Sequence, residues 1–185
     1  MKIGIIIGSI REGRLGSAVA RWVHELALGR GSVAAKEHEY ELIDLKHYPL
    51  PLIDAEVIPG DAKGDYADPQ VQAWADTIEG FDAFVFVSPE YNGSIPGPFK
   101  NAFDSIYQEW LNKPVALVVY SFSAGKSIAA SWSVPLNRLK MDIVQPVVGL
   151  TIPDNFSEDN ARIVDAESLA AELSLALDRI EMTAG

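Results

Sequence analysis

The chain has 185 residues, the usual length of one domain, and its 48% hydrophobic and 22% charged residues are typical of a globular protein. Its formal net charge of −11 argues against broad binding to nucleic acids or anionic membranes, since both need a basic face. The absence of cysteine excludes disulfides, cysteine metal sites and a thiol nucleophile, and the three histidines follow no metal-binding spacing.

We therefore expect a single soluble domain over residues 1–185, without a metal site and without a membrane span. The apolar run near the N-terminus ends at Gly8 and is followed by charged residues, which is typical of a first strand and not of a signal peptide. A cytoplasmic location is compatible with this composition.

Apolar runs of strand length alternate with longer segments of helical period, the pattern of a parallel sheet covered by crossover helices. Three runs, IGIII, AFVFV and VALVV, are apolar at nearly every position, as strands covered on both faces should be. The predicted strands are residues 2–7, 40–45, 83–88, 115–120 and 143–150. The predicted helices are residues 15–29, 70–79, 96–108, 126–139 and 166–183. The fold class is therefore α/β.

Residues 47–69 are rich in proline and acidic side chains and show no sustained period, which indicates a long surface loop. Loops of this length are often functional or disordered. A lid, a partner contact and a plain surface excursion are all open interpretations of this segment.

Three strand ends carry the polar residues of interest, because ligands of open parallel α/β sheets bind beyond the carboxyl ends of the strands. The first, GSIREGRLGS, combines small residues and arginines before a helix, which suits a phosphate group. It is not a P-loop, since Arg14 and Leu15 follow Gly13, and it lacks the GxGxxG spacing of a dinucleotide site. A plain strand-to-helix turn with arginines facing solvent is the alternative.

The other two strand ends are SPEYNGS and SFSAGKS. In the former, Pro89 and Gly93 favour a turn that leaves Tyr91 and Asn92 at the edge of the sheet, where a flat heteroaromatic ring can lie. Alternatively, Tyr91 covers the core and Asn92 adopts a positive φ. In the latter, the backbone amides of residues 121–125 can face a carbonyl-rich ring edge, although a simple helix cap is an equal alternative.

In this order, GSIRxGR, SPEYNGSIPGPFKNAFD and SFSAGKS resemble the NADPH-dependent FMN reductase family of flavodoxin-like proteins, which includes quinone, azo-dye and chromate reductases. The resemblance spans essentially the whole chain, and PEYNGSIPGPFKNA is its most specific part. It implies a three-layer flavodoxin-like sandwich with a five-stranded parallel sheet of order 2-1-3-4-5 and non-covalently bound FMN. The chain departs from the common GSxRxxSxN pattern at Arg14 and Gly16, and its third loop has less glycine than is usual.

The resemblance also implies the residues of the cofactor site. Those around the FMN phosphate would be Ser9, Arg11, Arg14, Leu15 and Gly16; those along the isoalloxazine ring would be Pro89, Glu90, Tyr91, Asn92 and Gly93; and those at its pyrimidine end would be Ser121, Phe122 and Ser123. No catalytic acid or base is expected, because the flavin carries the chemistry.

The implied activity is hydride transfer from NADPH or NADH to flavin N5, followed by two-electron reduction of a small-molecule quinone, azo, metal or flavin acceptor. The alternatives are a flavodoxin-like electron carrier or flavin-binding protein without nicotinamide turnover, and an interaction domain that has lost the cofactor. The family is generally a homodimer or homotetramer, and Tyr107, Trp110 and Leu111 suit either a subunit contact or the core.

Overall fold

One parallel sheet organises the molecule, whose computed structural model describes residues 1–30 and 38–183. Its strands lie in the order β2-β1-β3-β4-β5, which confirms the predicted flavodoxin-like topology. The strands are β1 (Lys2–Ile7), β2 (Glu39–Asp44), β3 (Ala83–Pro89), β4 (Val115–Ser121) and β5 (Ile143–Thr151). Their ends differ from the predicted ends by at most one residue.

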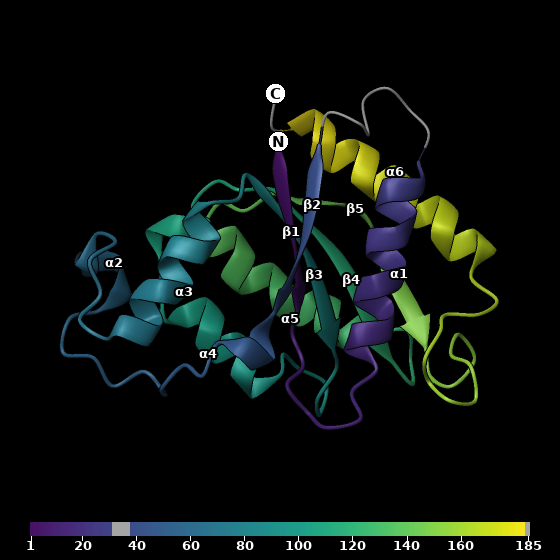
Figure 1. Ribbon diagram of the computed structural model, residues 1–185, viewed down its shortest axis with the longest axis horizontal. Helices are drawn as coiled ribbons and strands as arrows, with labels where there is room; N and C mark the ends of the chain where they lie inside the picture. The colour runs from purple at the N-terminus through teal and green to yellow at the C-terminus, as the bar shows by residue number, and fades with distance from the viewer. Residues whose placement is uncertain (31–37, 184–185) are drawn as a thin grey trace.

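Helices cover both faces of the sheet and bury two separate apolar clusters (Figure 1). The helices α1 (Gly16–Gly29) and α6 (Glu167–Thr183) pack on one face, where Val23, Leu177 and Ile5 belong to one buried cluster. The helices α3 (Pro69–Glu79), α4 (Gly97–Asp104) and α5 (Lys126–Arg138) pack on the other, which is rich in aromatic rings. Among residues 1–30 and 38–183, no helix combines the length and apolar character needed to span a bilayer.

The helix predicted over residues 96–108 ends at Asp104, and the short 3-10 helix η3 (Gln108–Trp110) follows it. A longer helix would need the Tyr107 N–H to donate to the carbonyl of Phe103. That carbonyl instead accepts from the Trp110 indole at 3.1 Å, while the Tyr107 N–H donates to the Tyr66 hydroxyl at 3.0 Å. Tertiary hydrogen bonds therefore end the helix early.

The long loop over residues 47–69 is held against the α3 and α4 layer. It contains the helix α2 (Pro59–Ala62) and begins within the 3-10 helix η2 (Leu45–His47), neither of which was predicted. The Tyr66 hydroxyl donates to the buried carboxylate of Glu109 at 2.8 Å, and the Asn101 amide donates to the Pro51 carbonyl at 2.8 Å. The loop lines a cavity of about 460 Å³ that shares no residue with the strand-end cleft described below.

Candidate cofactor site

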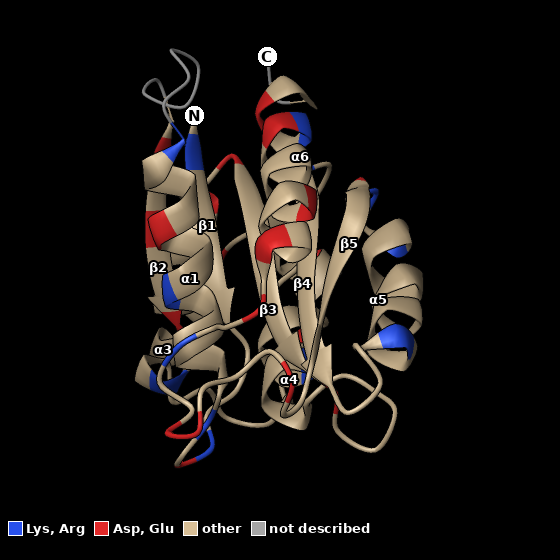
Figure 2. Cartoon of the chain, turned by 90° about the vertical axis from the view of Figure 1, so that its right-hand side faces the viewer, with Lys and Arg blue, Asp and Glu red and all other residues tan. Residues whose placement is uncertain are grey.

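The loops after the strands gather at the carboxyl end of the sheet, opposite the N-terminus of β1 (Figure 2). A cleft lies among these loops. Its volume is about 760 Å³, within the usual range for small-molecule sites. All of the predicted site residues except Gly16 line it. Segments that follow β1, β3, β4 and β5 thus converge on one cavity.

The loop after β1 leads into an α1 N-terminus that has no side-chain cap. A Cβ on Gly8 would lie 2.0 Å from the Phe99 ring, so only glycine fits where this loop begins. Gly13 adopts φ +64° and turns the chain toward the helix. No side chain caps the helix at Leu15, and its first turn contains no acidic residue. The Ala18 N–H donates to the Leu15 carbonyl at 3.0 Å, so the remaining first-turn N–H groups and the positive end of the helix dipole suit an anion.

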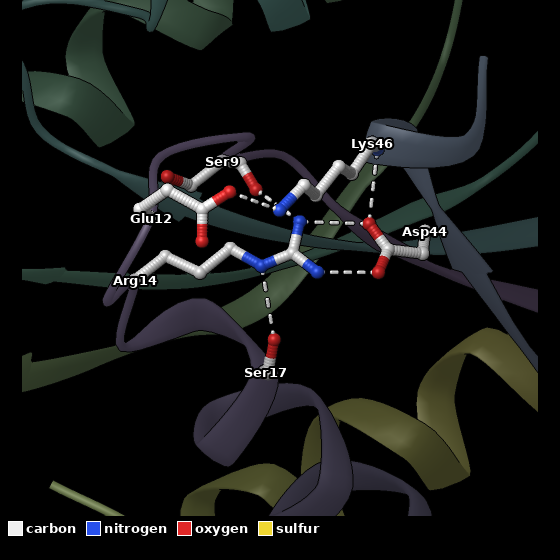
Figure 3. A network of polar contacts seen from close by, with 6 residues as sticks. All are labelled: Ser9, Glu12, Arg14, Ser17, Asp44 and Lys46. Atoms are coloured by element: carbon white, nitrogen blue, oxygen red, sulfur yellow. Dashed lines mark hydrogen bonds and ion pairs between the residues drawn. The ribbon is translucent and has the colours of Figure 1, made fainter.

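Arg14 joins this loop to β2 and to α1 (Figure 3). Its Nη1 donates to Oδ1 of Asp44 at 2.8 Å, and its Nη2 forms an ion pair with Oδ2 of the same carboxylate. Nη1 also donates to the Ser9 carbonyl at 2.7 Å, and Nε donates to Oγ of Ser17 at 3.0 Å. Arg14 is therefore an internal link of the site, with a side chain that is only 12% exposed.

The pKa of Asp44 reflects this pairing. Partial burial acts to raise that pKa, but the hydrogen bonds from Arg14 and from the Lys46 backbone, together with the Arg14 charge, bring it below the usual value. Asp44 is paired with Ile7 across the sheet, so the end of β2 lies beside the start of the loop. The ionised carboxylate is thus part of the site's architecture.

Arg11 differs from Arg14 in having an exposed side chain. It lines the cleft and makes no hydrogen bond or ion pair with any residue in the described part of the chain. Its guanidinium is therefore available to an anionic ligand.

The segment after β3 is a tight hairpin. The N–H of Tyr91 donates to the carbonyl of Ser94 at 3.0 Å, and the N–H of Ser94 donates back at 3.0 Å. Between them, Asn92 and Gly93 adopt φ values of +51° and +77°, as in a type I′ turn, which Asn-Gly favours. The positive φ anticipated as one alternative for Asn92 is thus present, and the Tyr91 ring also lines the cleft.

Glu90 precedes this hairpin and lines the cleft, and one oxygen of its carboxylate is unusual. Its N–H donates to the Tyr120 carbonyl at 3.2 Å, which continues the pairing of β3 with β4. Its Oε2 is buried and has no hydrogen-bond partner among the described residues. A buried acceptor without a partner is costly, so this oxygen fits a site that receives a ligand donor.

The turn after β4 is organised by the Ser121 hydroxyl. Its Oγ accepts the N–H of Ser123 at 3.0 Å and the N–H of Gly125 at 2.8 Å. The prediction that backbone amides of residues 121–125 face a ring edge therefore does not extend to these two amides. Phe122, at the tip of the turn, is 82% exposed although it is strongly apolar.

Sequence reasoning missed Gly13, Tyr120, Ile152 and Asn160, which also line the cleft. Ile152 and Asn160 follow β5, and the parallel arrangement of the sheet was a signal that this strand ends at the same edge. Tyr120 is buried, which raises the pKa of its phenol, so the ring stays neutral. A Cβ on Gly16 would lie 2.8 Å from the Tyr120 hydroxyl, and this close approach explains the glycine at that position.

Known proteins resemble this chain in sequence and in structure. Residues 1–151 match the family model described as "NADPH-dependent FMN reductase". An NAD(P)H-dependent FMN reductase of Schizosaccharomyces pombe is 36% identical over 82% of this chain and 74% of its own length. A quinone reductase of Pseudomonas putida is 31% identical over 76% of this chain and 71% of its own length.

Among solved structures, the flavoenzyme NAD(P)H:(acceptor) oxidoreductase FerB of Paracoccus denitrificans superposes with a TM-score of 0.73 at 25% identity. The superposition covers 98% of each chain, so the likeness includes the helices and loops as well as the sheet. The chain therefore belongs to the NADPH-dependent FMN reductase family of flavodoxin-like oxidoreductases.

Proposed function

We propose that this protein binds FMN in the strand-end cleft and uses NADPH or NADH to reduce a small-molecule acceptor of the quinone, azo, metal or flavin class. The observation that carries the proposal is the convergence of an uncapped α1 N-terminus, Arg11 and the Tyr91 hairpin on one cleft. The relatives named as FMN reductase and quinone reductase support the same chemistry.

The residues of the cleft fit FMN in charge and in shape. FMN has a dianionic phosphate, which suits Arg11 and the first-turn amides of α1. Its flat ring suits a cleft of about 760 Å³ bordered by the Tyr91 hairpin and the Ser121 turn. Its hydrogen-bond donors suit the unpaired Oε2 of Glu90.

When bound, FMN supplies the two-electron chemistry that links the nicotinamide to the acceptor. The protein's own residues bind and orient the cofactor. Arg11 and the start of α1 hold the anionic end, Pro89 and Tyr91 border the ring, and Ser121 fixes the turn that carries Phe122. No side chain of the cleft acts as a catalytic acid or base in this scheme. The protein contributes by positioning the reactants and by electrostatic stabilisation.

The test is an absorption spectrum of the purified protein before and after incubation with FMN and desalting, followed by anaerobic NADPH. Retained flavin bands that bleach promptly with NADPH are the expected result. Retained bands that persist with both NADPH and NADH would favour an electron carrier without nicotinamide turnover. A colourless protein after desalting would contradict the proposal and favour an interaction domain that has lost the cofactor.

We also propose that the protein is a cytoplasmic homodimer or homotetramer. The long loop exposes four large apolar side chains, Leu52, Ile53, Val57 and Ile58, which is a feature of association surfaces. Trp110 is fully buried and belongs to the core, whereas Tyr107 and Leu111 are partly buried. Sedimentation at micromolar concentration is expected to show a dimer or tetramer, and a monomer alone would contradict this proposal.

A further inference from the structure

The charged residues around the loop after β1 are mostly paired with one another. Arg14 binds Asp44, and Nζ of Lys46 lies 2.5 Å from Oε1 of Glu12 (Figure 3). The Lys46 N–H also donates to Oδ1 of Asp44 at 3.0 Å, so Lys46 contacts both acidic residues, Glu12 and Asp44. These contacts balance two positive side chains with two negative ones. Arg11 is left as the cation of the loop that has no partner among the described residues.

The guanidinium of Arg14 has little capacity left for a ligand. A guanidinium has five N–H donors, and four contacts are made by Arg14: one from Nε, two from Nη1 and one from Nη2. They reach the Ser9 carbonyl, the Ser17 hydroxyl and both oxygens of Asp44. Three segments, namely the loop, the first turn of α1 and the end of β2, are therefore fixed relative to one another by one side chain.

We propose that Arg14 and Asp44 are positioning residues, which hold the loop after β1 in the shape that receives the FMN phosphate, while Arg11 provides the side-chain charge that meets it. The inference rests on the proposed function, since it concerns the same cleft. It assigns Asp44, which lies outside the set of predicted site residues, to the binding machinery. It also gives Arg14 an indirect role in place of the direct phosphate contact that the family resemblance implies.

The two roles of Arg14 make opposite predictions for Asp44→Asn. If Arg14 contacted the phosphate directly, loss of the competing carboxylate would free its guanidinium, and FMN would bind as well as before or more tightly. If Arg14 is a positioning residue, Asp44→Asn loses the bidentate pair, the loop loses its fixed shape and FMN binds more weakly.

The experiment is a titration of the flavin-free protein with FMN and with riboflavin, followed by quenching of flavin fluorescence. Riboflavin lacks the phosphate, so the ratio of the two dissociation constants isolates phosphate recognition. We expect Asp44→Asn, Arg14→Lys and Arg11→Ala each to lower the preference for FMN by roughly tenfold or more, with little change in the riboflavin constant. Arg14→Lys is informative because it keeps the charge and loses only the fork geometry.

The double variant Arg14→Met/Asp44→Asn separates geometry from charge. Arg14→Met alone leaves the Asp44 carboxylate without its partner, so FMN is expected to bind more weakly than in the double variant. Equal FMN binding by Arg14→Met and by the double variant would contradict the coupling of the two residues.

Arg30→Met is the matched control, because it breaks another poorly exposed ion pair outside the cleft. The side chain of Arg30 is 10% exposed and pairs with Glu181, near the opposite end of α1. This variant is expected to unfold at a lower temperature while it retains the wild-type ratio of riboflavin to FMN constants. A similar fall of that ratio in Arg30→Met would show that general loosening explains the effect, which would overturn the inference.

The outcomes distinguish the inference from the proposed function. A wild-type protein that binds neither flavin would overturn the proposed function and the inference with it. A wild-type protein that prefers FMN, together with an Asp44→Asn variant that binds FMN at least as tightly, would overturn the inference alone.

Discussion

The hydroxyl oxygens of Ser9 and Tyr91 lie 2.7 Å apart, although 82 positions separate the two residues in sequence. This hydrogen bond joins the loop after β1 to the hairpin after β3, which border the same cleft. Ser9 is only 2% exposed, so water has little access to its hydroxyl. The two loops that we assign to the phosphate and to the ring are thereby linked through their side chains.

Tyr91→Phe should remove this link and leave the Ser9 hydroxyl without its partner. We expect a loss of about 1–2 kcal/mol in the free energy of unfolding and weaker binding of FMN, because a buried polar group loses its hydrogen bond. Urea unfolding and flavin titration measure the two effects. The double variant Ser9→Ala/Tyr91→Phe should lose less free energy of unfolding than the sum of the losses in the two single variants. Strictly additive losses would argue against a shared hydrogen bond.

Gly93→Ala tests the hairpin through backbone strain alone. A Cβ at Gly93 would meet no atom within 4 Å, but its φ of +77° is unfavourable for alanine. We expect a loss of roughly 1–2 kcal/mol in the free energy of unfolding. Gly29→Ala is the control: its Cβ also meets open space, and at the end of α1 the change should be neutral or stabilising. Equal effects of the two substitutions would contradict the strain argument.

Gly16→Ala should destabilise the protein for a different reason, namely the close approach of Tyr120. The added Cβ would lie 2.8 Å from the Tyr120 hydroxyl and 3.3 Å from a methyl group of Ile7. Such overpacking typically costs about 1–3 kcal/mol. Tyr120→Phe removes the nearer atom, so the double variant should recover part of the loss in thermal unfolding. No recovery would place the clash elsewhere.

Phe122 is expected to contact the second substrate. Its ring is largely exposed at the edge of the cleft, where it can stack against a flat nicotinamide or quinone. Phe122→Ala should raise KM for the quinone or the nicotinamide by roughly 3- to 10-fold and leave the FMN dissociation constant and the unfolding temperature unchanged. Val134 is also an exposed apolar residue, but it lies on α5 and outside the cleft. Val134→Ala should change none of these quantities. Weaker FMN binding by Phe122→Ala would instead make it a cofactor contact.

Asp44 should make stability dependent on pH at the acidic end. Its pKa in the folded protein is below the usual value of 3.8, so the folded state binds fewer protons than the unfolded state in this range. The stabilising contribution is present above that usual value and is lost as the pH falls through the lowered pKa. Urea unfolding should show Asp44→Asn less stable than wild type at pH 6, with a smaller difference at pH 3. A difference that does not change with pH would contradict this account.

The sheet could be predicted closely from the sequence because its central strands are almost wholly apolar. Runs such as AFVFV need burial on both faces, and this leaves little choice of strand position. The end of the α4 helix could not be predicted in the same way. It depends on the Tyr66 hydroxyl, which is 41 positions from Tyr107 in the chain and captures the Tyr107 N–H.

The site could be predicted in its residues but not in their connections. The motifs predicted the three loops of the site, and a positive φ at Asn92 was one of the two interpretations of the second loop. The pairing of Arg14 with Asp44 required the knowledge that β2 lies next to β1, which places Asp44 opposite Ile7. Likewise, the capture of two backbone amides by the Ser121 hydroxyl depends on the exact path of the turn, which composition does not determine.

The order of the sheet also has a consequence for self-association. Within residues 1–30 and 38–183, the outer strands β2 and β5 have one open edge each, which in many proteins leads to strand addition and aggregation. Here β2 carries the exposed acids Glu39 and Glu41, and β5 contains Pro146 within an irregular stretch of its pairing with β4. Charged side chains on β2, where Glu41 also pairs with Lys2, and a missing N–H donor in β5 oppose continuation of the sheet between copies. Contacts between copies are therefore expected at helices and loops and not along the edges of the sheet.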